Sequence, residues 1–388
     1  MKRAAAALED SVASLALLVM VLLPLLEIVW RRAFGTGIPA SGPIVQHLTL
    51  WVGFLGAAIA AREGKLLALA TGTFIPPGLW RRAADVLAAA FGACAALILS
   101  WGGYRMMLLE REAGTNIGAG IQTWVAQLVL PVAFALIALR VVWKVGSLSE
   151  VSAVVASTGA KITAASRSAK ASAERALWID RGLASLGLVA GVLFLRVPSI
   201  LETHALWPAF VIVVAAAVVG TPLFAILGGT AALLFMHDGV TPATILIETY
   251  TLSVSPTLPA IPLFTLAGFL LAEGKASERL LRVFRAFFGW IPGGTAVVCA
   301  VLCSFFTVFT GGSGVTILAL GGVLFPALLK DGYREKFSLG LLTASGSLGL
   351  LLPPSLPLIL YAVVAQIPIE DLFIGGLLPG ILLTAMIA

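Results

Sequence analysis

The residues that could do chemistry in this chain are neutral oxygen donors, and they gather in two interrupted apolar segments. Residues 293–329 contain no Asp, Glu, His, Lys or Arg. Residues 337–366 carry glycines, serines and a proline pair in mid-segment. The candidate binding residues of the two segments are Thr310, Gly311, Gly312, Ser313, Gly314, Thr316, Ser345, Gly346, Gly349, Pro354 and Ser355. Hydroxyl and main-chain carbonyl oxygens suit an alkali or alkaline-earth cation, and no side chain here could couple to protons.

The first segment is predicted to enter and leave the membrane by the same face. Basic stretches at 279–285 and 330–336 flank it on both sides, and basic loops are typically cytoplasmic. The glycine-rich cluster at its centre favours a turn, so we expect a re-entrant helical hairpin. Two short antiparallel spans joined by an exterior turn are the alternative, since each limb just reaches the minimum length for a crossing.

The second segment is predicted to be a broken helix. The pair Pro353-Pro354 follows Gly349 and interrupts the helix near its middle. Secondary transporters build ion and substrate sites from such interruptions, and helix N-termini opened there favour anions. The two segments together favour a sodium-coupled carrier of an anionic solute. The alternative for this segment is a structural kink relieved by neighbouring hydroxyls.

The amino-acid composition indicates which class of protein contains these segments. Of 388 residues 60% are hydrophobic and 11% are charged, far fewer charges than the quarter or so that a soluble protein carries. Repeated continuous apolar runs predict an all-α polytopic membrane protein with about ten spans, and exclude a soluble enzyme and a β-barrel. The net charge of +6 is attributed to cytoplasmic loops rather than to nucleic-acid binding. Cys94, Cys299 and Cys303 lie in apolar runs and indicate no disulfide.

The order of spans follows from hydropathy and loop charge. Four spans are expected at 12–30, 44–61, 83–104 and 121–143. Basic residues after the second and the fourth span place both loops, and hence the N-terminus, in the cytoplasm. The break Gly220-Thr221-Pro222 divides 207–236 into two short spans, and a further span is expected near 255–272. Residues 275–290 alternate charged and apolar positions at helical spacing and predict an interfacial amphipathic helix.

Several motifs resemble the large membrane subunit of tripartite ATP-independent periplasmic (TRAP) transporters. They are IPLFTLAG at 261–268, Gly293-Gly294, FTGGSGVT at 309–316, Gly332-Tyr333 and, most specific, ASGSLGLLLPPSLPLILY at 344–361. RRAFGTGIP and WVGFLGAAIAAREGK, within residues 1–145, resemble the small membrane subunit of the same family. The chain therefore resembles a fused small-plus-large subunit.

This resemblance implies a domain order. The expected regions are a four-span small-subunit-like domain at 1–145, a cytoplasmic Ser/Ala-rich linker at 146–180, a connecting membrane helix at 181–200, scaffold helices at 205–273, an amphipathic arm at 274–291, and half a transport domain with the hairpin and broken helix at 292–388. It also implies an elevator-type permease of the bacterial inner membrane, driven by sodium as the coupling ion without another cofactor. By the same resemblance, Na⁺ would bind at Ser313, Ser345 and Gly349. A periplasmic binding protein would deliver organic acids such as dicarboxylates, and membrane lipid would surround the protein.

The family's large subunit has an inverted second repeat with its own hairpin and broken helix. No second charge-free, glycine-tipped hairpin precedes Ala388. We therefore expect either a truncated chain or a second polypeptide that supplies the other half. A non-transporting scaffold or split gene product is the alternative function. A membrane enzyme is disfavoured, because His47, His204 and His237 are scattered and no G-x-S-x-G or H-E-x-x-H pattern occurs.

Overall fold

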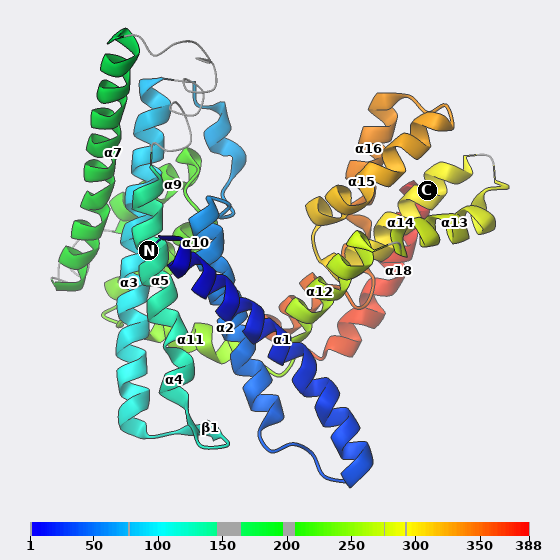
Figure 1. Ribbon diagram of the computed structural model, residues 1–388, viewed down its shortest axis with the longest axis horizontal. Coiled ribbons are helices and arrows are strands. Elements are labelled where there is room, and N and C mark those ends of the chain that lie inside the picture. The colour runs from blue at the N-terminus through cyan, green and yellow to red at the C-terminus, as the bar shows by residue number, and fades with distance from the viewer. Residues whose placement is uncertain are drawn as a thin grey trace. The chain divides into compact units, whose positions relative to one another are not determined.

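A computed structural model describes residues 2–76, 78–145, 164–196, 206–274, 276–291 and 293–387. These residues are almost entirely helical, with one small two-stranded sheet among them. The fold class is therefore the all-α one that the sequence predicts. The chain forms two compact units, Met1–Thr251 and Leu252–Ala388, and each is described by itself (Figure 1). The division falls inside the segment 205–273 that was expected to hold the scaffold helices.

The first unit is a bundle of long helices. Its elements are α1 Lys2–Phe34, α2 Ser41–Glu63, the 3₁₀ turn η1 Ala70–Phe74, α3 Leu79–Ala113, β1 Asn116–Gly118, β2 Ile121–Gln122, α4 Thr123–Gln127, α5 Val129–Lys144, α7 Ala164–Arg196, α9 Leu206–Val219, α10 Leu223–His237 and α11 Ala243–Ser253. Its core joins α2, α3, α5 and α11 through Leu50, Ala96, Leu130, Ile137 and Leu246. The predicted break at 220–222 separates α9 from α10.

The connecting helix α7 packs closely along α3. A Cβ atom added to Gly187 would lie 2.0 Å from the carbonyl oxygen of Ala90, and one added to Gly191 would lie 3.3 Å from that of Cys94. This small-xxx-small spacing lets two membrane helices approach closely. The helix begins at Ala164, so part of the expected linker at 146–180 is helical, because its alanine-rich composition also favours helix. Residues 146–163 lie outside the described residues.

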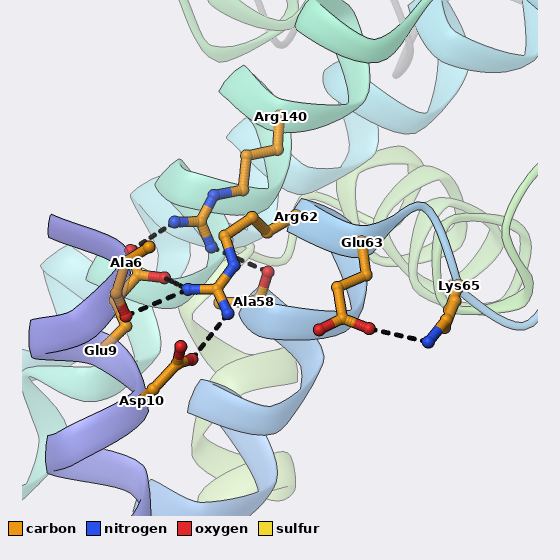
Figure 2. A network of polar contacts seen from close by, with 8 residues as sticks. All are labelled: Ala6, Glu9, Asp10, Ala58, Arg62, Glu63, Lys65 and Arg140. Atoms are coloured by element: carbon orange, nitrogen blue, oxygen red, sulfur yellow. Dashed lines mark hydrogen bonds and ion pairs between the residues drawn. The ribbon is translucent and has the colours of Figure 1, made fainter. Parts of the chain in front are cut away.

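Charged side chains tie the N-terminal helix to its neighbours (Figure 2). The guanidinium of Arg62 on α2 donates to Asp10 Oδ1 at 2.6 Å and to Glu9 Oε2 at 3.3 Å. Arg140 on α5 donates to the other oxygen of Glu9 and, at 2.8 Å, to the carbonyl of Ala58. The network joins the start of α1, the end of α2 and the later part of α5. These ends therefore lie at one level of the bundle, in agreement with the predicted up-down order of the first spans.

The second unit contains the two interrupted segments. Its elements are α12 Ala260–Glu273, α13 Ala276–Phe288, α14 Gly294–Thr310, α15 Ser313–Lys330, α16 Glu335–Ser345, η2 Leu348–Leu351, α17 Leu356–Ala365 and α18 Ile369–Ile387. Its core gathers α14, α15 and α16 around Cys299, Phe306, Leu320, Leu324 and Leu342. Cys299 and Cys303 are fully buried there without a disulfide.

The predicted amphipathic segment is the helix α13. Leu281 is buried, and Leu280, Phe284 and Phe288 pack against the same core as the hairpin helices. Arg285 is half-buried, and its guanidinium lies 3.5 Å from Asp331 Oδ2. One apolar side of α13 therefore packs on protein, while Val283 and Phe287 are exposed, and the position of the helix at the membrane interface stays a prediction.

Six described helices are long and apolar enough to cross a membrane, or seven if the bent pair formed by α16 with η2 and α17 counts as one span. They include four that match the expected first four spans, and α7 and α18. The other expected crossings fall on apolar helices of 10–17 residues, such as α9, α10, α12 and α14. The broken helix bends by 42° at its interruption.

Candidate cation and substrate site

The hairpin turns at the predicted glycine pair. Gly311 has φ +65°, which glycine adopts without the steric cost that a Cβ atom brings. Its N–H donates to the carbonyl of Thr307 at 2.9 Å and so ends α14. Gly312 is extended, and its carbonyl accepts from the N–H of Thr316 at 3.2 Å, which begins α15. The turn therefore consists of two residues and joins α14 directly to α15.

Three threonine hydroxyls form a buried cluster immediately beside this turn. The Oγ1 atom of Thr316 lies 2.8 Å from that of Thr310 and 2.9 Å from that of Thr307. Thr307 and Thr316 are fully buried, and Thr310 is nearly so. Two of these residues were predicted from sequence, and the structure places Thr307 between them and the broken helix.

The broken helix lies against the hairpin at this cluster. Thr307 Oγ1 lies 3.0 Å from the carbonyl oxygen of Gly346. A Cβ atom on Gly349 would lie 2.1 Å from the carbonyl oxygen of Ser304, so only glycine allows η2 to approach α14 this closely. On the other side, a Cβ atom on Gly311 would lie 2.7 Å from Leu356 Cδ1, at the start of α17. The hairpin turn and the helix interruption therefore form one junction.

At this junction there are more oxygen atoms within hydrogen-bonding distance of one another than there are hydroxyl protons to form hydrogen bonds between them. Thr307 Oγ1 carries one proton but lies within hydrogen-bonding distance of three oxygens, those of Cys303, Thr316 and Gly346. Ser345 is fully buried, and its Oγ has no hydrogen-bond partner among the described residues. A buried hydroxyl without a partner is costly, and such groups call for an explanation such as an ion or a water.

The remaining residues predicted for the site either form hydrogen bonds within the protein or have open space beside them. Ser355 Oγ donates to the carbonyl of Leu350 at 2.5 Å, and Pro354 follows a cis peptide bond. The carbonyl of Gly349 accepts from the N–H of Leu352 at 3.2 Å. A Cβ atom on Gly314 would meet nothing within 4 Å.

Of the two predicted Na⁺ ligands whose oxygens the structure describes, Ser345 has a hydroxyl without a partner, whereas the carbonyl of Gly349 has one. Gly349 is required chiefly for close packing. The side chain of Ser313 lies outside the described part of the structure. No group of three or more His, Cys, Asp or Glu side chains that could hold a metal is found in the described residues. Any cation bound at the junction would therefore be held by neutral oxygens, which suits an alkali ion.

Sequence reasoning missed Thr307, although its spacing carried a signal. Thr307 and Thr310 are three apart on one helix and share a face, and Ser304 lies one further turn back. Ser304 Oγ bonds to the carbonyl of Ala300 at 2.8 Å and lies 3.4 Å from Thr384 Oγ1 of α18. Hydroxyl residues on one helix face next to a glycine turn would have indicated both Ser304 and Thr307 as candidate site residues.

Comparison with known proteins agrees with this architecture. Residues 20–149 match the family model of the tripartite ATP-independent periplasmic transporters, DctQ component, and residues 209–388 match that of the DctM component. The chain is 32% identical over 181 residues to the C4-dicarboxylate TRAP transporter large permease protein DctM of Vibrio cholerae, covering 46% of this chain and 40% of the relative.

Two further relatives have different named solutes. The ectoine TRAP transporter large permease protein TeaC of Halomonas elongata is 36% identical over 154 residues, which cover 39% of this chain and 36% of the relative. The isethionate TRAP transporter permease protein DctMQ of Oleidesulfovibrio alaskensis is 36% identical over 166 residues, which cover 42% of this chain and 26% of the relative. The matched residues thus span less than half the length of these relatives.

All three relatives are named as permeases, and none as an enzyme. The two family models match successive parts of one polypeptide that has several helices able to cross a membrane. The chain therefore belongs to the tripartite ATP-independent periplasmic transporter family, as a multi-pass membrane protein in which a part that matches the DctQ component is followed by a part that matches the DctM component.

Proposed function

We propose that this chain is the permease part of a sodium-coupled secondary transporter that imports organic acid anions across the bacterial inner membrane. A periplasmic binding protein would deliver the anion, and the N-terminus would lie in the cytoplasm. The family membership supports the transporter class. Sodium coupling, the carboxylate solute and the receptor are the parts that experiments must establish.

The observation that carries the sodium proposal is the junction of the hairpin and the broken helix. The buried Ser345 hydroxyl without a partner lies next in sequence to Gly346, whose carbonyl contacts the threonine cluster. Hydroxyl and carbonyl oxygens without a formal charge can replace the hydration shell of Na⁺. Residues 293–329 carry no group that titrates near neutral pH, which makes this site a poor one for proton coupling.

The anion part of the proposal depends on helix N-termini. The helix α15 begins at Ser313 and α17 begins at Leu356, and the contact of Gly311 with Leu356 places both starts at the same junction. Helix N-termini carry partial positive charge and free N–H groups, which favour anions. Relatives named for C4-dicarboxylate and isethionate transport agree with a small organic anion, while ectoine in a third name shows that the solute varies within the family.

The transport step would follow the elevator scheme that the resemblance implies. The hairpin and the broken helix would move with the bound ion and solute, and α13 would act as the arm between the moving part and its scaffold. The packing of Leu281 and Phe284 on the hairpin core gives α13 a firm attachment to the moving part. The second half of the site would come from the inverted repeat that the family's large subunit contains.

The test measures Na⁺ binding by the purified full chain in detergent, which does not require the other half of the site. The thermal midpoint is compared in NaCl and in choline chloride at equal ionic strength. A ligand that binds only the folded state stabilises it by about 2.7 kcal/mol at about 100 times its dissociation constant. We expect NaCl, and not KCl, to raise the midpoint.

The matched variants are Ser345→Ala and Ser347→Ala. Ser347 lies two residues further on, is exposed, and bonds to the carbonyl of Ala344 at 2.9 Å. We expect Ser345→Ala to remove the Na⁺-dependent rise and Ser347→Ala to keep it. A rise that is equal in both variants would refute the site, and no rise in the unchanged protein would favour the non-transporting alternative. Radiolabelled succinate uptake then tests transport itself, in proteoliposomes that also contain a polypeptide with the family's second repeat, with receptor added and with or without Na⁺.

A further inference from the structure

The segment between α2 and α3 lies against the turn that separates α9 from α10. The N–H of Leu223 donates to the carbonyl of Leu67 at 2.8 Å. Ala68 and Pro222 form an isolated antiparallel β-bridge. The hydroxyl of Thr71 donates to the carbonyl of Ala217 at 3.1 Å. Residues 67–72, named here the latch segment, belong to the part that matches DctQ, and the turn belongs to the part that matches DctM.

One of these contacts gives a partner to the N–H of Leu223, and the other adds the Thr71 hydroxyl as a second donor to the carbonyl of Ala217, which also accepts from the N–H of Gly220 at 3.1 Å. Leu223 is the first residue of α10 and Ala217 lies in the last turn of α9. The first N–H groups and the last carbonyls of a helix have no partner inside the helix. Such groups are expensive to leave unpaired inside a membrane protein. The latch segment supplies an acceptor at one helix end and a donor at the other.

The fit between the latch segment and the turn is close. A Cβ atom on Gly72 would lie 2.8 Å from the carbonyl oxygen of Val219. Gly220 has φ +91°, and a Cβ atom there would lie 3.4 Å from Gly72 Cα. On the opposite side, Arg81 at the start of α3 donates to the carbonyl of Gly72 at 2.7 Å. The latch segment is therefore held between α3 and the turn.

We propose that the latch segment is the assembly surface through which the DctQ part completes and holds the α9–α10 turn of the DctM part. Its partner is this turn, recognised by main-chain pairing and by the absence of side chains at Gly72 and Gly220. The two parts then stay together through this surface, through the contacts of α7 and α10 with α3, and through the core that Leu246 of α11 shares with α2, α3 and α5, whether or not the peptide between them is intact. This proposal is independent of which ion or solute the protein carries.

The experiment starts from the full chain with a site-specific protease sequence inserted between residues 150 and 160. The protein is purified in detergent through an N-terminal tag, cleaved after folding and bound again to the affinity resin. The measured quantity is the fraction of the C-terminal piece that stays with the tagged piece after warming. We expect high retention in the unchanged protein and retention lowered about fivefold or more by Gly72→Leu.

The control is Gly53→Leu, because a Cβ atom on Gly53 of α2 would meet nothing within 4 Å. Thr71→Val is a milder variant that removes one hydrogen bond, and we expect retention between those of the unchanged protein and Gly72→Leu. Equal retention in Gly72→Leu and Gly53→Leu would overturn the proposal.

A cross-link covers the case in which Gly72→Leu does not fold. The Cα atoms of antiparallel partners lie about 4.5–5.5 Å apart, inside the range of roughly 4.4–6.8 Å that a disulfide spans. Ala68→Cys together with Pro222→Cys should therefore join the two cleaved pieces on a non-reducing gel after mild oxidation. Absence of this band in monodisperse cleaved protein would overturn the proposal by itself.

Discussion

Two of the interruptions in the apolar stretches of this chain, the one between α9 and α10 and the one between α16 and α17, are closed in different ways. Between α9 and α10, the exposed backbone groups are taken up by the latch segment, through the carbonyl of Leu67 and the hydroxyl of Thr71. Between α16 and α17, the neighbouring groups are the Thr307 hydroxyl and the backbone of α14, and Ser345 Oγ keeps no partner among the described residues.

The difference shows what distinguishes a structural break from a candidate binding site. Both breaks contain glycine and proline, and both bury a hydroxyl without a partner in the described residues, Thr221 Oγ1 in the first and Ser345 Oγ in the second. Among the described residues, the second has a cluster of three hydroxyl oxygens beside it, those of Thr307, Thr310 and Thr316, whereas the further hydroxyl described at the first is that of Thr71, which bonds to the carbonyl of Ala217. A cation needs several oxygen ligands. A single buried hydroxyl without a partner therefore costs only some stability, whereas a group of oxygens can form a cation site.

The largest effect is expected at the packing contact of the second break. Gly349→Ala would place a Cβ atom 2.1 Å from the carbonyl oxygen of Ser304 and must push η2 away from α14. Overpacking of this kind costs up to about 3 kcal/mol. We expect a lower thermal midpoint and loss of the Na⁺-dependent rise. Gly340→Ala is the control, because a Cβ atom there would meet nothing within 4 Å, and an equal loss in both variants would contradict the role of the contact.

A smaller effect is expected from the hydroxyl that links hairpin and broken helix. Thr307→Val keeps the shape of the side chain and removes the contacts with Gly346 and Thr316. Lost hydrogen bonds of this kind cost about 1–2 kcal/mol, and we expect the apparent Na⁺ affinity to fall about tenfold, which equals about 1.4 kcal/mol. The affinity is read from the midpoint as a function of NaCl concentration. Thr343→Val, which changes an exposed hydroxyl on α16, should leave it unchanged.

The positions of both breaks were predicted from the sequence, but the groups that close them were not, for a physical reason. The hairpin turn at Gly311, the interruption before Pro354 and the candidate residue Ser345 all follow from local signals: missing charges, glycine pairs and prolines. Thr307 was missed because a hydroxyl that bonds its own helix is common in membrane helices. Its role appears only when Gly346, 39 residues away, is brought to it.

The latch segment could not be found from sequence at all. Leu67 takes part through its carbonyl oxygen and Ala68 through backbone pairing, groups that every residue type possesses. The early start of α7 at Ala164 was missed for a different reason. Ser and Ala residues suit both a linker and a helix, and contacts with other parts of the chain decide between the two.

A moderate effect is expected where the first break is fixed to α3. Arg81→Met removes the guanidinium that donates to the carbonyl of Gly72 and keeps much of the apolar stem. A hydrogen bond from a charged donor contributes about 1.5 kcal/mol or more, although Arg81 is partly exposed, and we expect about 1 kcal/mol after solvent screening. The thermal midpoint should fall and the Na⁺-dependent rise should persist. We expect the two breaks to act independently. Loss of the Na⁺-dependent rise in Arg81→Met would contradict this independence.

The smallest effect is expected at the hydroxyl of the first break. Thr221 is fully buried, and its Oγ1 has no partner among the described residues. Replacing a buried unpaired polar group by an apolar group of the same shape is close to neutral or slightly stabilising, so Thr221→Val should change stability by no more than about 0.5 kcal/mol. The thermal midpoint and the response to NaCl are measured together, beside Ser345→Ala. If Thr221→Val were as damaging to the Na⁺ response as Ser345→Ala, the isolated hydroxyl would itself serve ion binding. The number of grouped oxygens would then no longer separate a structural break from a functional one.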